Sequence, residues 1–298
     1  MKSSLILNDL TCIDHAYIDD KGRVIGGSAH PTIILTGNVT EDENVVIDFS
    51  KCKKLIKSLI DDPNTGFDHK LWLMSNSNVE VFIHPEMYEV STPCLTITTD
   101  LNALKTLSCE YSAESIGKEI SAYLEENISQ QLGYNLTVAC IISFNFHAMH
   151  GGVGSYPFRY AHGLKNSSSY GCQNIAHGHL SYIQVLGENY SPLGHSEELS
   201  TYVKKLADRF DGTYFVFKEN VATATNNICC LEYESNSRGT FSAVIRTSEQ
   251  KTEIIETETT IEHLVEHLKK HSGKQLKKFG VKYLVVSEGL TKGSIVEL

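Results

Sequence analysis

The chain has 298 residues, 41% of them apolar, so it is long enough to bury one large core or two of ordinary size. Its formal charge of -10 argues against nucleic acid or an anionic membrane surface as the main partner, because both need a basic face. No segment reaches the ~20 apolar residues of a membrane span, and Met1 to Leu10 lacks a signal-peptide pattern, which together predict a cytoplasmic protein. Eight cysteines without a CxxC pair do not indicate a secreted disulfide framework.

Taken in chain order, the predicted elements occur twice, at a spacing of roughly 145 residues. Each half begins with an apolar strand that ends in histidine, LTCIDH (Leu10 to His15) or PFRYAH (Pro157 to His162). A second strand, an amphipathic helix, a strand that begins with Phe-Asp, a second helix and a last strand follow in both halves. Two unrelated modules could share such an order, but the Phe-Asp pairs at matching positions favour an internal repeat.

This order predicts an α+β fold with antiparallel sheets and helices packed on one face, since it lacks the alternation of a parallel βαβ protein. Glycines cluster between His147 and Ser155, which predicts a linker there and domains at residues 1–150 and 151–298. Both halves carry a long insertion before the second helix, Ser75 to Cys109 and Glu219 to Glu258, for which the sequence indicates no role.

The segment YGCQNIAHGHLSYIQV, from Tyr170 to Val185, predicts a metal site. His177 and His179 stand two apart on a strand, so both project from one face roughly 7 Å apart. His162 ends the preceding strand and would lie beside them in a hairpin. Three imidazoles leave the fourth zinc position open for substrate. Solvent-facing histidines are the alternative for an isolated HxH pattern, whereas a cupin is excluded because no glutamate follows at the required spacing.

Cys172 lies shortly before this histidine pair, in the loop that the hairpin closes. Near a divalent cation its pKa would fall, and the thiolate could act as a base or nucleophile. It could equally be a fourth zinc ligand, which would make a closed structural site. The spacing alone leaves both interpretations open.

Taken together, these motifs resemble a known family. FxxAH, a cysteine, HGHxxY, a downstream Asp-His pair and a last strand that ends in glutamate are similar to the 6-pyruvoyltetrahydropterin and 6-carboxytetrahydropterin synthases. Members are single T-fold (tunnelling-fold) domains of about half this length, so the resemblance implies two tandem T-folds. It also implies sheets that close into a barrel when chains assemble, here as a homo-oligomer, a trimer or a dimer.

The resemblance also implies roles for individual residues. His162, His177 and His179 would be the zinc ligands, and Cys172 the catalytic thiolate. Asp68 and His69 match the Asp-His pair that works with the cysteine in proton transfer. Glu288, in LVVSEGLTKG, matches the glutamate that anchors the 2-amino-4-oxo edge of the pterin.

The halves are degenerate in complementary ways. The first reads SAH (Ser28 to His30) at the HGH position, so only the second is expected to bind zinc. The second reads Asp211-Gly212 where the first has Asp68-His69. Because family active sites form between subunits, each copy can lose a different part and one whole site remains. We therefore expect Asp68 and His69 to lie within a few ångströms of Cys172.

The function implied is that of a zinc-dependent lyase that converts 7,8-dihydroneopterin triphosphate to 6-carboxy-5,6,7,8-tetrahydropterin, in the 7-deazaguanine (queuosine) pathway. One alternative is 6-pyruvoyltetrahydropterin synthase activity, in which triphosphate is eliminated. Another is a non-catalytic T-fold protein that binds a pterin or purine. All of these interpretations require a small-molecule ligand and no nucleic acid or membrane partner.

Overall fold

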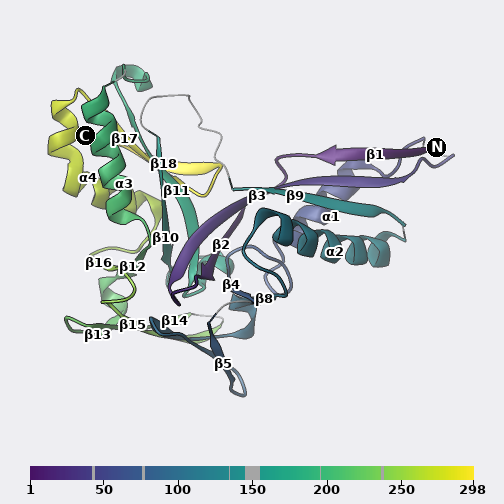
Figure 1. Cartoon of the computed structure of the whole chain (residues 1–298), viewed down its shortest axis with the longest axis horizontal. Helices are drawn as coiled ribbons and strands as arrows, with labels where there is room; N and C mark the ends of the chain where they lie inside the picture. The colour runs from purple at the N-terminus through teal and green to yellow at the C-terminus, as the bar shows by residue number, and fades with distance from the viewer. Residues whose placement is uncertain (42–43, 76–77, 134, 145–154, 195, 236–237) are drawn as a thin grey trace.

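A computed structural model describes residues 1–41, 44–75, 78–133, 135–144, 155–194, 196–235 and 238–298. Within these ranges the chain forms four α-helices and three six-stranded sheets, so the α+β prediction is confirmed (Figure 1). None of the helices in the described ranges is long and apolar enough to cross a membrane. The predicted linker and the domain boundary at residue 150 fall almost entirely outside the described residues.

The first sheet comes from the first half of the chain. Its strands are β1 (Lys2–Leu7), β2 (Ile13–Ile18), β3 (Val24–Asn38), β4 (Lys70–Met74), β8 (Leu104–Leu107) and β9 (Thr137–Ser143). β3 is antiparallel to β1, β2 and β9, whereas β4 is parallel to both β2 and β8. The sheet is therefore mixed rather than antiparallel throughout. Helices α1 (Phe49–Ile60) and α2 (Ala113–Leu132) bury their apolar faces with it in one core.

The second sheet repeats this arrangement with the second half. Its strands are β10 (Tyr156–His162), β11 (His177–Leu186), β12 (Thr213–Phe217), β16 (Thr252–Ile255), β17 (Tyr283–Glu288) and β18 (Lys292–Glu297). β12 again lies parallel to β10 and to β16, and the other pairs are antiparallel. Helices α3 (Glu197–Phe210) and α4 (Ile261–Lys278) complete a second core. Five strands match in order, which is compatible with the predicted repeat; the sixth differs, because β1 pairs with β3 whereas β18 pairs with β17.

Local sequence explains where these helices begin and end. Asp48, Ser112 and Ser196 each accept a backbone N–H bond from the first turn of α1, α2 and α3 respectively. Such N-caps satisfy donors that have no partner inside the helix. α2 ends at Gly133, whose φ of 69° is a left-handed conformation that glycine adopts without a steric penalty.

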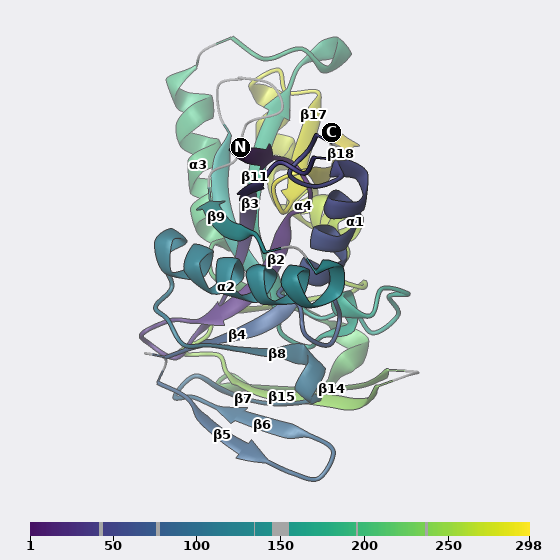
Figure 2. The same ribbon diagram turned by 90° about the vertical axis from the view of Figure 1, so that its right-hand side faces the viewer.

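The two insertions form the third sheet, which joins the halves. Its strands are β5 (Glu80–Ile83), β6 (Tyr88–Ser91), β7 (Leu95–Thr99), β13 (Val221–Ala224), β14 (Ile228–Ser235) and β15 (Gly239–Arg246). They run in the order β13-β14-β15-β7-β6-β5, with the halves meeting where β15 pairs antiparallel with β7. Figure 2 shows this sheet as a layer beneath β4 and β8. A shared apolar core connects it to both other sheets.

Two hydrogen bonds show how the halves correspond. The backbone N–H of Asp14 donates to the carboxylate of Asp68 (2.9 Å), and that of Arg159 donates to Asp211 (2.7 Å). Asp14 is therefore equivalent to Arg159, and the residue after each is a histidine in the first half and a tyrosine in the second. The sequence analysis matched the two strands at their terminal histidines, His15 and His162. The hydrogen bonds instead match His15 with Tyr160, so the sequence-based alignment is wrong by two residues.

The corrected register also changes the counterpart of the HGH segment. Tyr17 takes the place of His162, and the strand opposite it is β3 at Ile25. The segment equivalent to HGH is therefore Ile25 to Gly27 and not Ser28 to His30, as the sequence suggested. Neither segment contains two histidines, so the first half lacks the pair that HGH provides.

The first two sheets cross where two equivalent glycines meet. A Cβ atom on Gly26 would lie 1.9 Å from the backbone oxygen of Tyr160, and one on Gly178 would lie 2.6 Å from the Cα of Gly26. Only glycine permits backbones to approach this closely. The backbone N–H of Leu180 donates to the hydroxyl of Ser28 across the same crossing (3.0 Å). This contact brings residues of the first half against the histidines of the second.

Candidate metal centre and active site

Three histidines of the second sheet converge at its buried face. His162 ends β10 and pairs directly with His177 at the start of β11, and His179 follows on the same face of β11. All three side chains are fully buried. Their ligand nitrogens lie within 4.8 Å of one another, and the Nε2 atoms of His162 and His179 are 3.2 Å apart. The hairpin therefore provides positions that could hold one metal ion.

Each of these rings has its Nδ1 atom beside an oxygen acceptor, which leaves Nε2 directed to the centre. Outer contacts of this kind fix the tautomer and orientation of metal-binding histidines. His162 forms a hydrogen bond with the Thr259 hydroxyl (2.9 Å), and His177 forms one with the Asn174 backbone oxygen (2.9 Å). Nδ1 of His179 lies 3.3 Å from the Asp14 carboxylate, an ion-pair distance without hydrogen-bond geometry.

The donor set fits a divalent metal ion. Nε2 of His177 is buried and has no hydrogen-bond partner among the described residues, a condition that costs about 1–3 kcal/mol unless a ligand relieves it. Burial, with the neighbouring histidines, lowers the pKa of His162 and of His177 well below the ordinary value. Both imidazoles are therefore neutral, as metal binding requires.

Asp14, which the sequence analysis missed, comes from the first half of the chain. Its side chain is 3% exposed, and it accepts a hydrogen bond from the Ser28 hydroxyl (2.5 Å) besides facing His179. Burial alone would raise the pKa of Asp14, but His179 and Ser28 stabilise the carboxylate and lower it overall. An acid within the apolar strand of LTCIDH was the available signal, since buried carboxylates are rare unless they have a partner.

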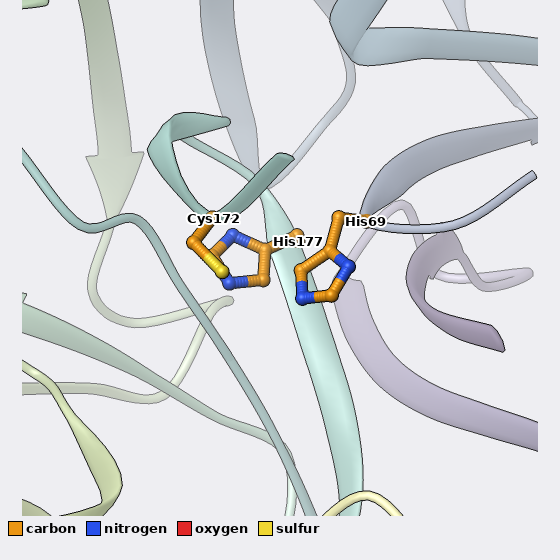
Figure 3. A group of neighbouring side chains, drawn as sticks. All are labelled: His69, Cys172 and His177. Atoms are coloured by element: carbon orange, nitrogen blue, oxygen red, sulfur yellow. The ribbon is translucent and has the colours of Figure 1, made fainter. Parts of the chain in front are cut away.

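Cys172 lies half-buried in the loop between β10 and β11, beside His69 of the first half. Ligand atoms of Cys172, His69 and His177 lie within 4.8 Å of one another, and Figure 3 shows the three side chains gathered beside β11. The predicted contact between His69 and Cys172 is thus present, and it forms within a single chain. Cys172 groups with His69 rather than with the full set of three histidines.

The backbone and side chain of His69 are both held in place. Its Nδ1 atom lies 2.6 Å from the Asp68 carboxylate, and its backbone oxygen accepts a hydrogen bond from the Asn174 side chain. Its φ of 55° is left-handed, a conformation uncommon outside glycine. The equivalent residue in the second half is Gly212, with a φ of 72°. The first half therefore holds an imidazole in a backbone position that glycine occupies in the second half.

Glu288 ends β17 close to the metal-facing histidines. Its Oε1 atom is 3.9 Å from Nε2 of His179, and its Oε2 atom is 2.8 Å from Nζ of Lys292. A pocket of about 400 Å³ is lined mainly by the first half, including Asp14 and His69, and by Thr291 and Lys292 of the second half. A small molecule in this pocket would meet groups from both halves.

Comparisons with known proteins find similarity in solved structures. No family model matches the chain, and no curated protein matches it. Half of the chain resembles 6-pyruvoyltetrahydropterin synthases. A catalytic-residue mutant of the Plasmodium vivax enzyme is 19% identical and covers 48% of this chain and 92% of its own, with a TM-score of 0.39. The Plasmodium falciparum enzyme is 17% identical over 48% of this chain and 99% of its own, with a TM-score of 0.35.

An uncharacterised protein from Wolinella succinogenes is also similar, at 13% identity over 48% of this chain and 94% of its own, with a TM-score of 0.32. The two Plasmodium enzymes carry the name of the family that the sequence motifs resemble. These similarities cover half of the chain, so the proposed function rests on the geometry of the site.

The Cys172–His69 contact shifts both groups toward a thiolate and an imidazolium. Burial by itself would raise the pKa of Cys172, but the neighbouring His69 lowers it below the ordinary value. Burial would likewise lower the pKa of His69, but Asp68 and Cys172 together raise it well above the ordinary value. The pair can therefore accept a proton at sulfur and donate one at nitrogen near neutral pH.

The third sheet fixes the loop that carries Cys172. Arg238, whose side chain is 1% exposed, forms a bidentate ion pair with Asp100 of the first half (2.6 and 2.7 Å). The same guanidinium donates to the backbone oxygen of Tyr170 (2.7 Å) and lies over its ring at 4.0 Å. Both insertions therefore contribute to holding the loop just before the cysteine.

Proposed function

We propose that the protein is a zinc-dependent lyase that converts 7,8-dihydroneopterin triphosphate to 6-carboxy-5,6,7,8-tetrahydropterin. The observation that carries this proposal is the meeting, in one chain, of three buried imidazoles with the Asp68–His69–Cys172 group. Neutral metal ligands beside a cysteine of lowered pKa are what proton removal next to a polarised oxygen requires.

In this proposal His162, His177 and His179 hold the zinc ion through Nε2. Bound zinc would supply polarisation of a substrate side-chain oxygen, which acidifies the neighbouring C–H bond. The thiolate of Cys172 accepts that proton. His69, oriented by Asp68, exchanges a proton at the adjacent carbon, and the Asp68 contact fixes the tautomer that makes this possible.

Glu288 is proposed to anchor the pterin. Burial alone would raise the pKa of Glu288, but His179 and Lys292 lower it, so the carboxylate is ionised at neutral pH. An ionised carboxylate can accept two N–H bonds from the 2-amino-4-oxo edge of the ring. Its position beside His179 would direct the pterin side chain toward the metal and Cys172.

The choice of product depends on whether a C–C bond breaks in addition to loss of triphosphate. The spacing CxxxxHGH differs by one residue from the CxxxHGH of the 6-carboxytetrahydropterin enzymes, whereas the 6-pyruvoyl enzymes have a longer gap. The spacing therefore departs from both patterns and does not decide the product; the 6-carboxy product is the first candidate because the sequence resemblance implies it. Elimination of triphosphate alone, giving 6-pyruvoyltetrahydropterin, is the second candidate.

The test is incubation of zinc-loaded protein with 7,8-dihydroneopterin triphosphate, followed by product identification by mass spectrometry. We expect 6-carboxy-5,6,7,8-tetrahydropterin from the wild type and none from Cys172→Ala. A 6-pyruvoyl product would select the second candidate. Full zinc occupancy without turnover would contradict a lyase and favour a protein that only binds a pterin or purine.

A further inference from the structure

A second group of metal-ligating side chains lies on the helical side of the second half. Glu253 of β16 faces His267 and His271 of α4, and their ligand atoms lie within 4.8 Å of one another. Nε2 of His267 is 2.7 Å from Oε1 of Glu253, and Nε2 of His271 is 3.5 Å from the same oxygen. We propose that these three residues bind a divalent transition-metal ion, as a site separate from the three-histidine centre.

The secondary structure sets up this arrangement. Histidines one helical turn apart project from the same face, so His267 and His271 form a natural two-nitrogen chelate. Leu264 and Leu268 on the buried side of α4 anchor the helix in the core of the second half. The histidine rings lie 4.6 Å apart, next to the strand that presents Glu253.

Two imidazoles and one carboxylate form a donor set that suits Zn²⁺ and related ions, with a further position for water. The side chains of Glu253, His267 and His271 are 24%, 16% and 33% exposed, so an ion can reach them from solvent.

Arg209 is the cation that a metal ion would replace. Its Nη2 atom lies 4.0 Å from Oε1 of Glu253, and its side chain is 49% exposed. The guanidinium lies over the Phe210 ring at 5.1 Å. Because this side chain is half exposed, it can turn away from Glu253, and a bound divalent ion would then neutralise Glu253 instead.

Metal binding here would also act on the three-histidine centre. Residues 256–260 connect β16 to α4 and include Thr259, whose hydroxyl contacts Nδ1 of His162. An ion that joins Glu253 to the helix would tie the two ends of this connection together. The second site would therefore hold in place a residue that orients His162.

Zinc uptake in matched variants tests the proposal. Metal-free wild type, His271→Ala and His263→Ala are dialysed against a series of buffered free Zn²⁺ concentrations, and zinc per chain is measured by mass spectrometry. His263 is exposed on the same helix and outside the cluster, so its variant is the control. We expect wild type and His263→Ala to take up one more zinc per chain than His271→Ala. Equal uptake by wild type and His271→Ala would overturn the proposal.

Glu253→Gln provides an independent test that keeps the size of the side chain and its hydrogen bond. Added Zn²⁺ should raise the Tm of wild type and His263→Ala by more than it raises the Tm of Glu253→Gln, because an ion bound only to the folded state stabilises it. Identical shifts would again overturn the proposal. All variants keep His162, His177 and His179, so absence of metal binding at the three-histidine centre would remove one zinc from every protein, and wild type and His263→Ala would still differ from the cluster variants.

Discussion

The carboxylate of Asp14 in β2 lies 3.3 Å from Nδ1 of His179 in β11, so a residue of the first half supports a metal-facing histidine of the second. The crossing of the two sheets at Gly26 and Gly178 makes this contact possible. Metal affinity should therefore depend on both halves of the chain, although the three candidate ligands all belong to one.

Replacing Asp14 should weaken metal binding without removing a ligand. Asp14→Asn keeps the shape of the side chain but removes the charge that orients His179. Loss of such a partner typically lowers metal affinity or activity 10- to 100-fold, and we expect a loss of zinc affinity of about this size. Competition with a chromogenic zinc chelator measures the affinity. Asp9→Asn is the control, because Asp9 is 87% exposed and contacts only His30 among the ion pairs of the described residues. Equal affinities in the two variants would show that Asp14 does not support the centre.

Cys172→Ala should separate the two roles that the sequence left open for the cysteine. If Cys172 is a base, the variant keeps zinc at full occupancy while turnover falls by roughly 10²–10⁴-fold. Zinc content and kcat are measured on the same preparation, with His177→Ala as the variant that should lose the metal. Loss of zinc from Cys172→Ala would instead identify the cysteine as a fourth ligand.

Alkylation should reveal the influence of His69 on the Cys172 thiol. The thiolate is the form that reacts, so a lowered pKa moves the midpoint of the rate profile to lower pH. His69→Asn removes the imidazolium and should move the midpoint to higher pH, and asparagine tolerates the left-handed backbone. Iodoacetamide labelling followed by peptide mass spectrometry measures the rates.

Cys140 serves as the internal reference for that experiment, because burial raises its pKa to about 12 and it should react slowly near neutral pH in both proteins. Superimposable Cys172 profiles for wild type and His69→Asn would mean that the two side chains do not interact in solution.

The sheet crossing should tolerate no side chain. A Cβ atom in Gly178→Ala would lie 2.5 Å from the backbone oxygen of Tyr160, and backbone atoms cannot move away cheaply. We expect a loss of roughly 1–3 kcal/mol in unfolding free energy, measured by urea denaturation, together with weaker zinc binding. Gly194→Ala is the matched control, since nothing lies within 4 Å of its added Cβ. Equal stability of the two variants would contradict the close approach of the sheets.

The sequence was sufficient to predict the α+β fold and the contact between His69 and Cys172. Helix caps and apolar periodicity are local signals, so the order of the elements could be read from them. The contact between the halves could be predicted because each half lacks the group that the other retains, Gly212 standing where the first half has His69.

Register and long-range pairing could not be predicted in the same way. The carboxylates of Asp68 and Asp211 set the register by accepting backbone N–H bonds from another strand, and no local pattern reports such a bond. The pairing of β7 with β15 joins segments far apart in the sequence, so the role of the insertions emerged only from the structure. The sequence did not indicate a role for Asp14, because its partner, His179, belongs to the other half.

One active site is proposed to be assembled from both halves of a single chain, and the activity of mixed variants tests this arrangement. His69→Asn and Cys172→Ala each remove one side of the shared site. Because His69 and Cys172 meet within one chain, the two variants mixed and reassembled should form no whole site. We predict product formation from wild type with 7,8-dihydroneopterin triphosphate, and none from either variant or from their mixture. Recovery of activity in the mixture would show that the site is shared between chains and not assembled within one.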